Sequence, residues 1–407
     1  MPVLHPNSPL LIVGASVRSA AQSALRAGFS PVCADAFADA DLRACAHVLP
    51  VADFPNGLSA AIAGVPVIPW IYTGGLENHP ALLGRLSRER PLLGNSANTV
   101  RQVRNPRRVA SVLQSAKLPA LEIRSPRIPP PRDGTWVLKP RMGSAGRGVV
   151  VWTPAHRDHA TRSEPHYFQQ RVAGAEYSAL FLAHGPDVEP TLIGISRQLI
   201  GISAANAPTA TAWCGNLAPA RVDPSTERTM YAVGAAVAGA FALRGLFGCD
   251  FLIADGIPWL TEINPRYTGS VELFEWHQRR SWLRDHVLAT QVEPPVSAST
   301  VPREPVESVS RSAASVIGKL IIYATRDTVY QGGFPAQLGS AVVNDFWTVP
   351  NIADIPATGQ PIPAGTPICT VFGVANDEES CLGILTARAT DFHYDANGDL
   401  LHLPGAR

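Results

Sequence analysis

The chain has 407 residues, a formal net charge of +1 and only 16% charged residues. This length is sufficient for two to four domains with hydrophobic cores of their own. A nearly neutral chain creates no strong electrostatic field, which argues against a protein that binds nucleic acids or anionic membranes.

The first hundred residues alternate between strand-like and helical patterns. Pro9 to Gly14 is a short apolar run, residues 15–28 have helical spacing, and the runs 31–34 and 65–71 are expected as further strands. This alternation predicts an open α/β domain with a parallel sheet over residues 1–100. Such sheets bind ligands at the carboxyl ends of their strands. The turns at 14–18 and 74–77 are therefore candidate substrate walls, although every such fold needs turns there for structural reasons alone.

A glycine-rich hairpin is expected after a stiff, proline-rich connector at residues 126–134. An apolar strand that starts at Trp136 ends in Lys139-Pro140, a loop with Gly143, Gly146 and Gly148 follows, and a second strand runs to Val151. Glycines let backbone N–H groups approach phosphate oxygens closely, and a lysine adds a positive charge. Because a strand follows the glycines, the motif is neither a Walker loop nor a dinucleotide fingerprint. By itself it could equally be an ordinary Gly-rich turn.

An acidic hairpin is predicted over residues 250–266. Two apolar runs flank Asp255-Gly256, and the second run ends in Glu262-Ile-Asn264-Pro-Arg266. Side chains alternate along a strand, so Glu262 and Asn264 share one face. A loop of three residues, 255–257, places Asp250 opposite Glu262, whereas a two-residue Asp-Gly turn places them on opposite faces. We adopt the longer loop, because it brings three hard oxygen ligands together in a set that suits Mg²⁺.

The remaining segments are expected to form a helix, a linker and a small domain around these two hairpins. The Ala/Gly-rich run 231–248 predicts a closely packed helix before the acidic hairpin. Residues 291–312 have the composition of a linker. From residue 313 an apolar strand and a run of turns and short strands predict a small β domain, to which we assign a structural role.

In combination, these motifs resemble the ATP-grasp superfamily over roughly residues 95–290. The resemblance implies α/β and α+β architecture: an N-terminal open parallel α/β domain, a central two-lobed ATP-grasp module at 101–290 and a small C-terminal β domain. It implies ATP and Mg²⁺, or Mn²⁺ in its place, as cofactors. The hinge strand of the family corresponds to Gln169-Gln170-Arg171-Val172-Ala173-Gly174-Ala175-Glu176.

The same resemblance assigns roles to individual residues. Lys139 contacts the phosphates, the loop with Gly143, Ser144, Gly146 and Gly148 covers them, and the hinge backbone at Gln170, Arg171 and Val172 meets adenine. Glu176 is the candidate for the ribose hydroxyls. Asp250, Glu262 and Asn264 hold the metal ion, and Arg266 faces the transferred phosphate or the acyl intermediate. Two positions depart from the family pattern: Arg107 stands where an early lysine is usual, and Gln169-Gln170 replaces the common Gln-Glu.

The resemblance predicts a carbon–nitrogen ligase that activates a small carboxylate as an acyl phosphate and joins it to an amine. The layout is most similar to stand-alone ligases of coenzyme biosynthesis, such as the tyramine–glutamate ligases of methanofuran-type pathways. Two alternatives stay open: a carboxylase that activates bicarbonate, which the C-terminal β region favours, and a nucleotide-binding protein without turnover, which Arg107 and Gln170 favour.

The expected partners are small acids and amines, with neither nucleic acid nor membrane. N-terminal α/β domains of this kind often pair, so the resemblance allows a homodimer. The six cysteines form no close pair of zinc or redox spacing, and no secretory leader pattern is visible, so we expect reduced thiols in a cytoplasmic protein.

Overall fold

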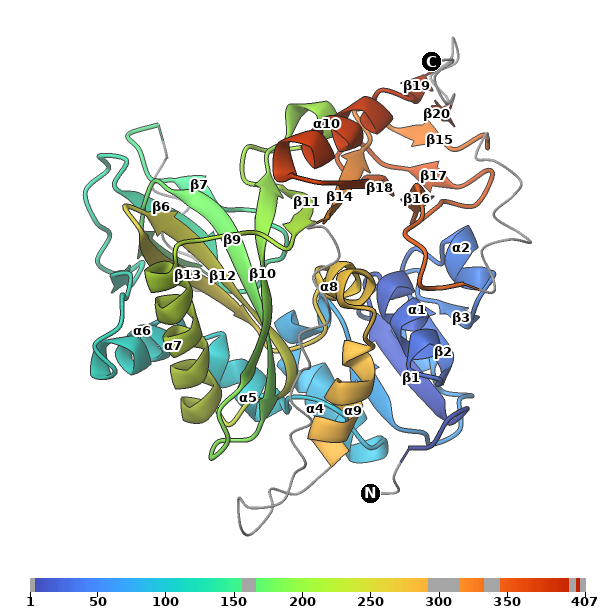
Figure 1. The fold of residues 1–407 in the computed structure, drawn as a ribbon, viewed down its shortest axis with the longest axis horizontal. Helices are drawn as coiled ribbons and strands as arrows, with labels where there is room; N and C mark the ends of the chain where they lie inside the picture. The colour runs from blue at the N-terminus through green and yellow to red at the C-terminus, as the bar shows by residue number, and fades with distance from the viewer. Residues whose placement is uncertain (1–3, 156–165, 292–314, 333–344, 395–399, 403–407) are drawn as a thin grey trace.

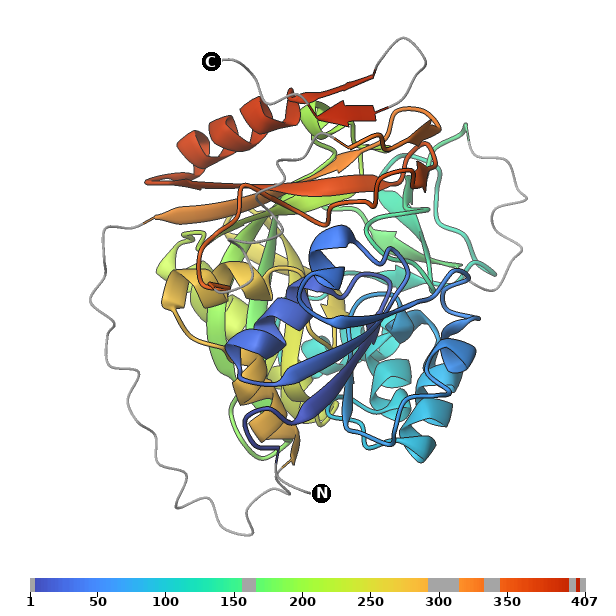
Figure 2. The ribbon, with the colours of Figure 1, turned by 90° about the vertical axis from the view of Figure 1, so that its right-hand side faces the viewer.

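The computed structural model describes residues 4–155, 166–291, 315–332, 345–394 and 400–402. Figure 1 shows an N-terminal domain, a central region with one small and one large sheet, and a C-terminal region beside the end of the large sheet. The view in Figure 2 places the N-terminal domain in front, with the C-terminal strands above it. The predicted linker falls largely on 292–314, outside the described residues.

The N-terminal domain has the expected parallel sheet, in the order β3-β2-β1-β4. Its core contains Leu10, Ile12 and Cys33, all fully buried. The strand expected at 65–71 is shorter than predicted: Val67 is 71% exposed, and only the end of the run enters the sheet. The elements are β1 (Pro9–Gly14), α1 (Arg18–Arg26), β2 (Ser30–Asp35), α2 (Ala40–Arg43), β3 (His47–Pro50), α3 (Leu58–Ala61), β4 (Trp70–Tyr72), η1 (Leu76–Asn78), α4 (Pro80–Glu89), α5 (Ala97–Val103) and α6 (Pro106–Ser115).

The small lobe of the central region is a four-stranded antiparallel sheet in the order β5-β8-β6-β7. One of its faces is sealed by a small aromatic core, in which Trp152 and Phe168 meet edge to face. The opposite face is left for the cleft described below. The strands are β5 (Ile123–Arg124), β6 (Trp136–Pro140), β7 (Val150–Val151) and β8 (His166–Gln170).

The large sheet has eight strands in the order β13-β12-β9-β10-β11-β14-β18-β16. The helix expected at 231–248 is present but displaced: α7 ends at Ala240, and residues from Arg244 onward already belong to β12. It packs closely, since a Cβ on Gly234 would lie 2.3 Å from the Phe181 ring. The elements are β9 (Ala175–His184), β10 (Thr191–Ile200), η3 (Ser203–Ala205), β11 (Trp213–Ala218), α7 (Pro224–Ala240), β12 (Arg244–Ala254), β13 (Ile257–Asn264), α8 (Val271–Gln278) and α9 (Trp282–Gln291).

The C-terminal region has its own core but no separate main sheet. Its first strand pairs with β11, so the large sheet runs without interruption from the acidic hairpin into this region. Leu320, Val371 and Leu385 are buried in the core beneath α10. The elements are β14 (Val316–Tyr323), β15 (Thr328–Val329), β16 (Ile352–Ala353), β17 (Pro361–Ile362), β18 (Pro367–Ala375), α10 (Glu378–Ala389), β19 (Phe392–Tyr394) and β20 (Leu400–His402).

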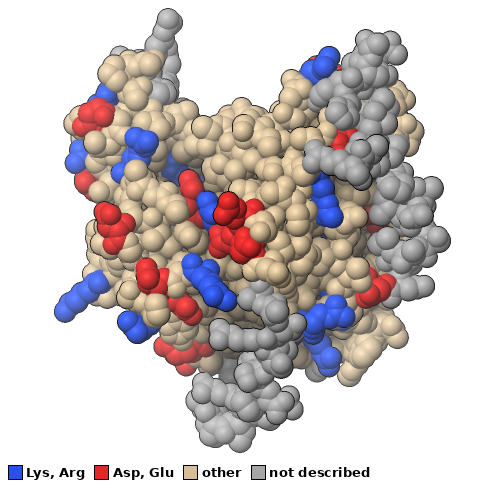
Figure 3. Space-filling model, turned by 45° about the horizontal axis from the view of Figure 1, so that its top comes forward, with Lys and Arg blue, Asp and Glu red and all other residues tan. Residues whose placement is uncertain are grey.

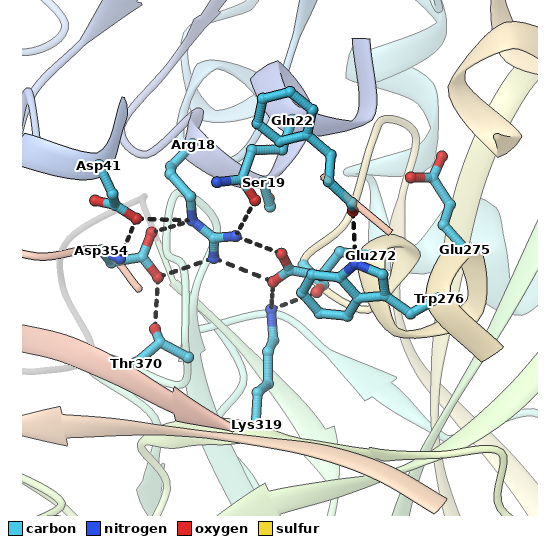
Figure 4. A network of polar contacts seen from close by, with 12 residues as sticks. Arg18, Ser19, Gln22, Asp41, Glu272, Glu275, Trp276, Lys319, Asp354 and Thr370 are labelled. Carbon is cyan, nitrogen blue, oxygen red and sulfur yellow. Dashed lines mark hydrogen bonds and ion pairs between the residues drawn. The ribbon is translucent and has the colours of Figure 1, made fainter. Parts of the chain in front are cut away.

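A buried ionic network joins these three parts (Figure 4). Arg18 from α1 contacts Glu272 of α8 at 2.6 Å and Asp354 after β16 at 2.9 Å. Lys319 from β14 reaches the other side of Glu272 at 3.2 Å, and Thr370 donates to Asp354 at 2.6 Å. Glu272 and Arg18 are almost fully buried, so their charges depend on one another for compensation.

Charged side chains of both signs are scattered over the face shown in Figure 3, most of which is uncharged. That view also shows a notch between the lobe that carries β6 and β7 and the C-terminal region. Among the helices of the described ranges, none combines the length and the apolar character needed to cross a bilayer.

Acid is expected to weaken the packing of α9 through His286, which is buried. The ring Nδ1 accepts from Leu246 N–H at 2.8 Å, and Nε2 lies 3.0 Å from Leu93 O, which defines a neutral imidazole. Burial lowers the pKa of His286 from its ordinary value to about 4. The neutral form is therefore favoured by the fold, and its stabilisation is complete above about pH 6.5 and lost as the pH falls toward 4.

Over this range we expect a loss of about 3 kcal/mol from this group. Urea unfolding at pH 7 and pH 5 measures the part of this loss that falls between these two pH values, about 2 kcal/mol. The dependence on pH should be shallower in His286→Gln, whereas the exposed control His47→Gln should match the wild type. Equal slopes for all three proteins would contradict the assignment.

Candidate active site

A cleft that is partly open to solvent lies between the small lobe and the acidic hairpin. β6 and β8 supply one wall with Lys139, Tyr167 and Gln169, and β13 supplies the other with Thr261 and Glu262. The glycine loop lies along its rim. The remaining lining residues are Val103, Arg104, Pro106, Val109, Ala110, Leu113, Leu121, Ile123, Pro140, Arg141, Gly143, Ser144, Gly146, Arg147, Val149, Leu260 and Ile263.

The acidic hairpin has the predicted register between Asp250 and Glu262, but its turn differs from the predicted one. The loop is the two-residue turn Asp255-Gly256, both with positive φ (50° and 75°), and Ala254 pairs with Ile257. The prediction of a three-residue loop is therefore wrong. Asp250 nevertheless pairs with Glu262, because a β-bulge shifts the register by one residue at Thr261.

The three predicted metal ligands lie together at this bulge. Asn264 donates to Asp250 Oδ2 at 2.9 Å, which places its side chain on the same face. Gln198 of β10 donates to Asp250 Oδ1 at 3.0 Å, so the carboxylate is held from both sides. Glu262 forms an ion pair with Arg104. Asp250, Glu262 and Asn264 are thus adjacent carboxylate and amide groups on the end of the large sheet.

The electrostatics of this cluster fit a divalent cation. Burial, and next the neighbouring Glu262 charge, raise the pKa of Asp250 to about 6. A cation beside the two carboxylates would remove this repulsion, and carboxylate and amide oxygens are hard ligands of the kind Mg²⁺ prefers. The set contains only two carboxylates, and no group of three or more His, Cys, Asp or Glu side chains suited to a metal occurs in the described ranges. Nucleotide phosphates and water would have to complete the coordination.

Lys139 connects the two walls of the cleft. Its Nζ donates to Gln169 Oε1 at 3.1 Å within the small lobe and to the Thr261 carbonyl at 3.3 Å across the cleft. The bulge at Thr261 is what turns that carbonyl toward the lysine. The structure therefore places Lys139 within one residue of Glu262 across the cleft.

The glycine loop is folded over onto β11 and η1. Thr211 Oγ1 donates to Gly146 O at 3.1 Å, and a Cβ on Gly146 would lie 1.8 Å from Thr211 O, so only glycine fits there. Ser144 Oγ accepts from Asn78 Nδ2 at 2.9 Å. Gly143, Ser144 and Gly146 line the cleft, whereas Gly148 (φ +75°) turns the chain into β7 without lining it.

Arg104 lines the cleft, and Arg107 does not. Arg104 pairs with Glu262 and donates to Asn78 Oδ1 at 2.6 Å and to Gly143 O at 3.1 Å. Arg107 is exposed on α6. Sequence reasoning missed Arg104, and the only signal for it was its place among four closely spaced arginines, Arg101, Arg104, Arg107 and Arg108.

The predicted hinge residues lie beside the cleft. Gln170 exchanges hydrogen bonds with the Glu122 backbone at 2.9 and 3.2 Å, and Arg171 N–H donates to Thr135 O at 2.8 Å. Gln170, Arg171 and Val172 do not line the cleft, whereas the neighbouring Gln169 does. Glu176 is half-buried at the start of β9, where it pairs with Leu252.

Arg266 connects the cluster of Asp250, Glu262 and Asn264 to the N-terminal domain. Its Nη2 donates to Asn264 Oδ1 at 3.2 Å and to Glu77 Oε1 at 2.7 Å. The candidate wall at 74–77 therefore does contact a predicted site residue, and a Cβ on Gly74 would lie 3.5 Å from Arg266 Cζ. The wall at 14–18 joins it, because Ala15 N–H donates to Gly74 O at 3.0 Å.

Comparisons with known proteins match a domain model to the part of the chain that contains this cleft. Residues 104–270 match the family model of an ATP-grasp domain. An uncharacterized protein of Methanocaldococcus jannaschii is 29% identical over 143 residues. That match covers 35% of this chain and 33% of the relative, so it spans about one third of the relative's length.

Solved structures share the fold over nearly the whole chain. The L-amino acid ligase of Bacillus licheniformis has a TM-score of 0.65 at 14% identity and covers 94% of this chain and 97% of its own. Biotin carboxylase of Campylobacter jejuni, solved with β-γ-ATP, has a TM-score of 0.63 at 13% identity, covering 93% and 90%. N5-carboxyaminoimidazole synthetase of Staphylococcus aureus, solved with ADP, has a TM-score of 0.62 at 14% identity, covering 96% and 99%. Residues 104–270 therefore form an ATP-grasp domain, and the chain as a whole shares the fold of these solved structures.

Proposed function

We propose that this protein is an ATP-dependent carboxylate–amine ligase. The observation that carries the proposal is one cleft that joins Lys139 and the glycine loop to Glu262 and the neighbouring Asp250. Arg266 lies at the end of the same hairpin, linked to Asn264. Lys139, Arg104 and Glu262 line the cleft, and hydrogen bonds and strand pairing connect Asp250, Asn264 and Arg266 to this wall; we assign the cations to the phosphates, the oxygen ligands to a metal ion and Arg266 to a developing oxyanion.

The chain's own residues have distinct tasks in the proposed reaction. The carboxylate oxygen of the acid attacks the γ-phosphorus of ATP, the bond to the β-phosphate oxygen breaks, and ADP leaves. Lys139 and Arg104 face this negative charge as it moves. The amine then attacks the acyl carbon, the bond to the phosphate-bearing oxygen breaks, and phosphate leaves while the nitrogen loses a proton. Arg266 is positioned to stabilise the intervening oxyanion.

Mg²⁺ held by Asp250, Glu262 and Asn264, when bound, would neutralise charge on the phosphate oxygens. Support for this assignment is the pairing of the two carboxylates and the raised pKa of Asp250. A role in coenzyme biosynthesis and a cytoplasmic location stay predictions.

The decisive experiment is a phosphate-release screen with purified protein, Mg-ATP and pools of acids and amines, followed by mass analysis of the condensed product. Phosphate release that requires both an acid and an amine supports the ligase. Release that requires bicarbonate but no amine supports a carboxylase instead. Nucleotide binding without release across a broad panel would favour the non-catalytic alternative.

Two arginines three positions apart give a matched test of the nucleotide side. Arg104→Ala removes a cation that contacts Glu262, Asn78 and the glycine loop, so we expect the KM for ATP to rise about tenfold, the worth of one hydrogen bond to a charged group. Arg107→Ala removes an exposed cation outside the cleft and should change the KM by less than about twofold. Steady-state kinetics measure both, and a larger effect at Arg107 would reverse the assignment.

A further inference from the structure

The short 3₁₀ helix η1 lies between the two halves of the candidate active site. The chain enters it through Gly74 and Gly75, and Gly75 has φ +100° where a Cβ would lie 2.9 Å from the Phe54 ring. Gly74 lies against Arg266, since its added Cβ would be 3.5 Å from the guanidinium carbon. The turn therefore brings η1 to the site in a conformation that favours glycine.

Glu77 of η1 holds Arg266 from one side. Its Oε1 accepts from Arg266 Nε at 2.9 Å and from Nη2 at 2.7 Å, and the side chain is 2% exposed. Burial opposes ionisation, but the charge and hydrogen bonds of Arg266 outweigh it and keep the pKa of Glu77 below its ordinary value. The second oxygen, Oε2, is buried and has no hydrogen-bond partner among the described residues.

This pairing is not the one that would stabilise the fold most. A bidentate arrangement would satisfy both carboxylate oxygens, whereas here one charged oxygen is left unpaired. The remaining donors of Arg266 go to Asn264 Oδ1 and to Tyr267 O at 3.1 Å. A guanidinium has five N–H donors, so one Nη1 donor has no acceptor within the described ranges. Glu77 fixes the orientation in which that donor stays available.

Asn78, the next residue, holds the other half of the site. Its Oδ1 accepts from Arg104 Nη2 at 2.6 Å, and its Nδ2 donates to Ser144 Oγ in the glycine loop at 2.9 Å. Arg104 in turn donates to Gly143 O. Adjacent residues of the N-terminal domain thus contact the arginine assigned to the acyl group and the loop assigned to the nucleotide.

We propose that η1 is a positioning element for both half-reactions: Glu77 orients Arg266 toward the reacting acyl group, and Asn78 holds the glycine loop over the nucleotide. The inference rests on the proposed ligase function and deepens it, because it assigns the N-terminal domain the positioning of groups that take part in the chemistry. Neither residue contacts substrate in this scheme, since each acts through another side chain.

The two residues should have opposite kinetic signatures. Glu77→Gln keeps the shape but removes the charge that orients Arg266, so kcat should fall by roughly tenfold or more while the KM for ATP changes less than about threefold. Asn78→Ala should raise the KM for ATP roughly fivefold or more and leave kcat within about threefold. Glu89→Gln, an exposed residue of α4, is the control and should behave as wild type. Equal effects of both variants on kcat and KM would indicate a merely structural role.

A double-mutant cycle separates positioning from folding. In an Arg266→Lys background the Nε and Nη2 donors that Glu77 Oε1 accepts from are gone, so adding Glu77→Gln should reduce kcat no further. Multiplicative losses would overturn the proposal.

A crystal structure of Glu77→Gln supplies a readout that does not depend on turnover. The Arg266 guanidinium should lie in a different position from the one it has in the wild type. An unmoved guanidinium would contradict the positioning role, and this result does not depend on finding an acid and an amine that support phosphate release. Absence of turnover in the wild type with a displaced Arg266 in the variant would instead remove only the ligase function.

Discussion

Glu262→Ala should reduce Mg-ATP turnover by at least about a hundredfold, roughly 3 kcal/mol of barrier, while the protein stays folded. Glu262 contributes one of the two carboxylates proposed for the metal ion, and its loss also leaves Arg104 without its ion-pair partner in the cleft. The side chain is 35% exposed, so the cost in stability should be no more than about 1 kcal/mol.

Phosphate release and a thermal melt measure the two effects separately. Glu262→Gln keeps the volume and should lose most of the activity, because the amide carries no charge for the cation. Glu89→Ala serves as the surface control. Full activity in Glu262→Ala would contradict the metal-site assignment. Loss of the cooperative melting transition would show that the substitution acts on folding rather than on the metal site.

Glu272→Ala should be the most destabilising single change in the ionic network of Figure 4, with an expected loss of about 3–5 kcal/mol. Glu272 is 0% exposed and lies between Arg18 and Lys319 at 2.6 and 3.2 Å. Its removal takes away the carboxylate that contacts both cations, so that the buried Lys319 loses this ion pair and Arg18 keeps Asp354 at 2.9 Å and Asp41 at 3.9 Å. The consequence should be a lower unfolding midpoint in urea, since the network joins all three parts of the chain.

The exposed pair of Arg197 and Glu378, 3.3 Å apart, offers a matched control. Glu378→Ala breaks an ion pair that solvent already screens, so its expected effect is below about 1 kcal/mol. Similar losses for the two variants would mean that burial does not control the strength of this network. A loss below about 1 kcal/mol for Glu272→Ala would have the same meaning.

The acidic hairpin shows how far sequence reasoning can reach. Alternation along a strand was enough to place Glu262 and Asn264 together, and the requirement for three oxygen ligands was enough to place Asp250 opposite Glu262. The loop length was wrong, because the extra residue is a bulge at Thr261 rather than a third loop residue. Bulges depend on cross-strand contacts, here the Thr261 hydroxyl bound to the Asp250 carbonyl at 3.0 Å, and such contacts leave no pattern in one sequence.

The sequence could not predict contacts between side chains that are far apart along the chain, for a related reason. Arg104 and Glu262 are 158 positions apart, and Glu77 and Arg266 are 189 apart. Arg107 stands at the position where the family pattern has its early lysine. In the structure α6 begins at Pro106, which leaves Arg107 exposed, whereas Arg104 lines the cleft. A three-residue difference at the junction of two helices decides which arginine reaches the site.

The sequence by itself predicted the ATP-grasp domain, the parallel N-terminal sheet and the two hairpins, because each depends on local spacing, on glycine and proline, and on alternation within one strand. Only the tertiary structure decided which cation enters the cleft, how the hairpin attains its register, and that β14 extends the central sheet. Those outcomes depend on how separate elements pack against one another, and packing is fixed by the shapes of surfaces that lie far apart along the chain.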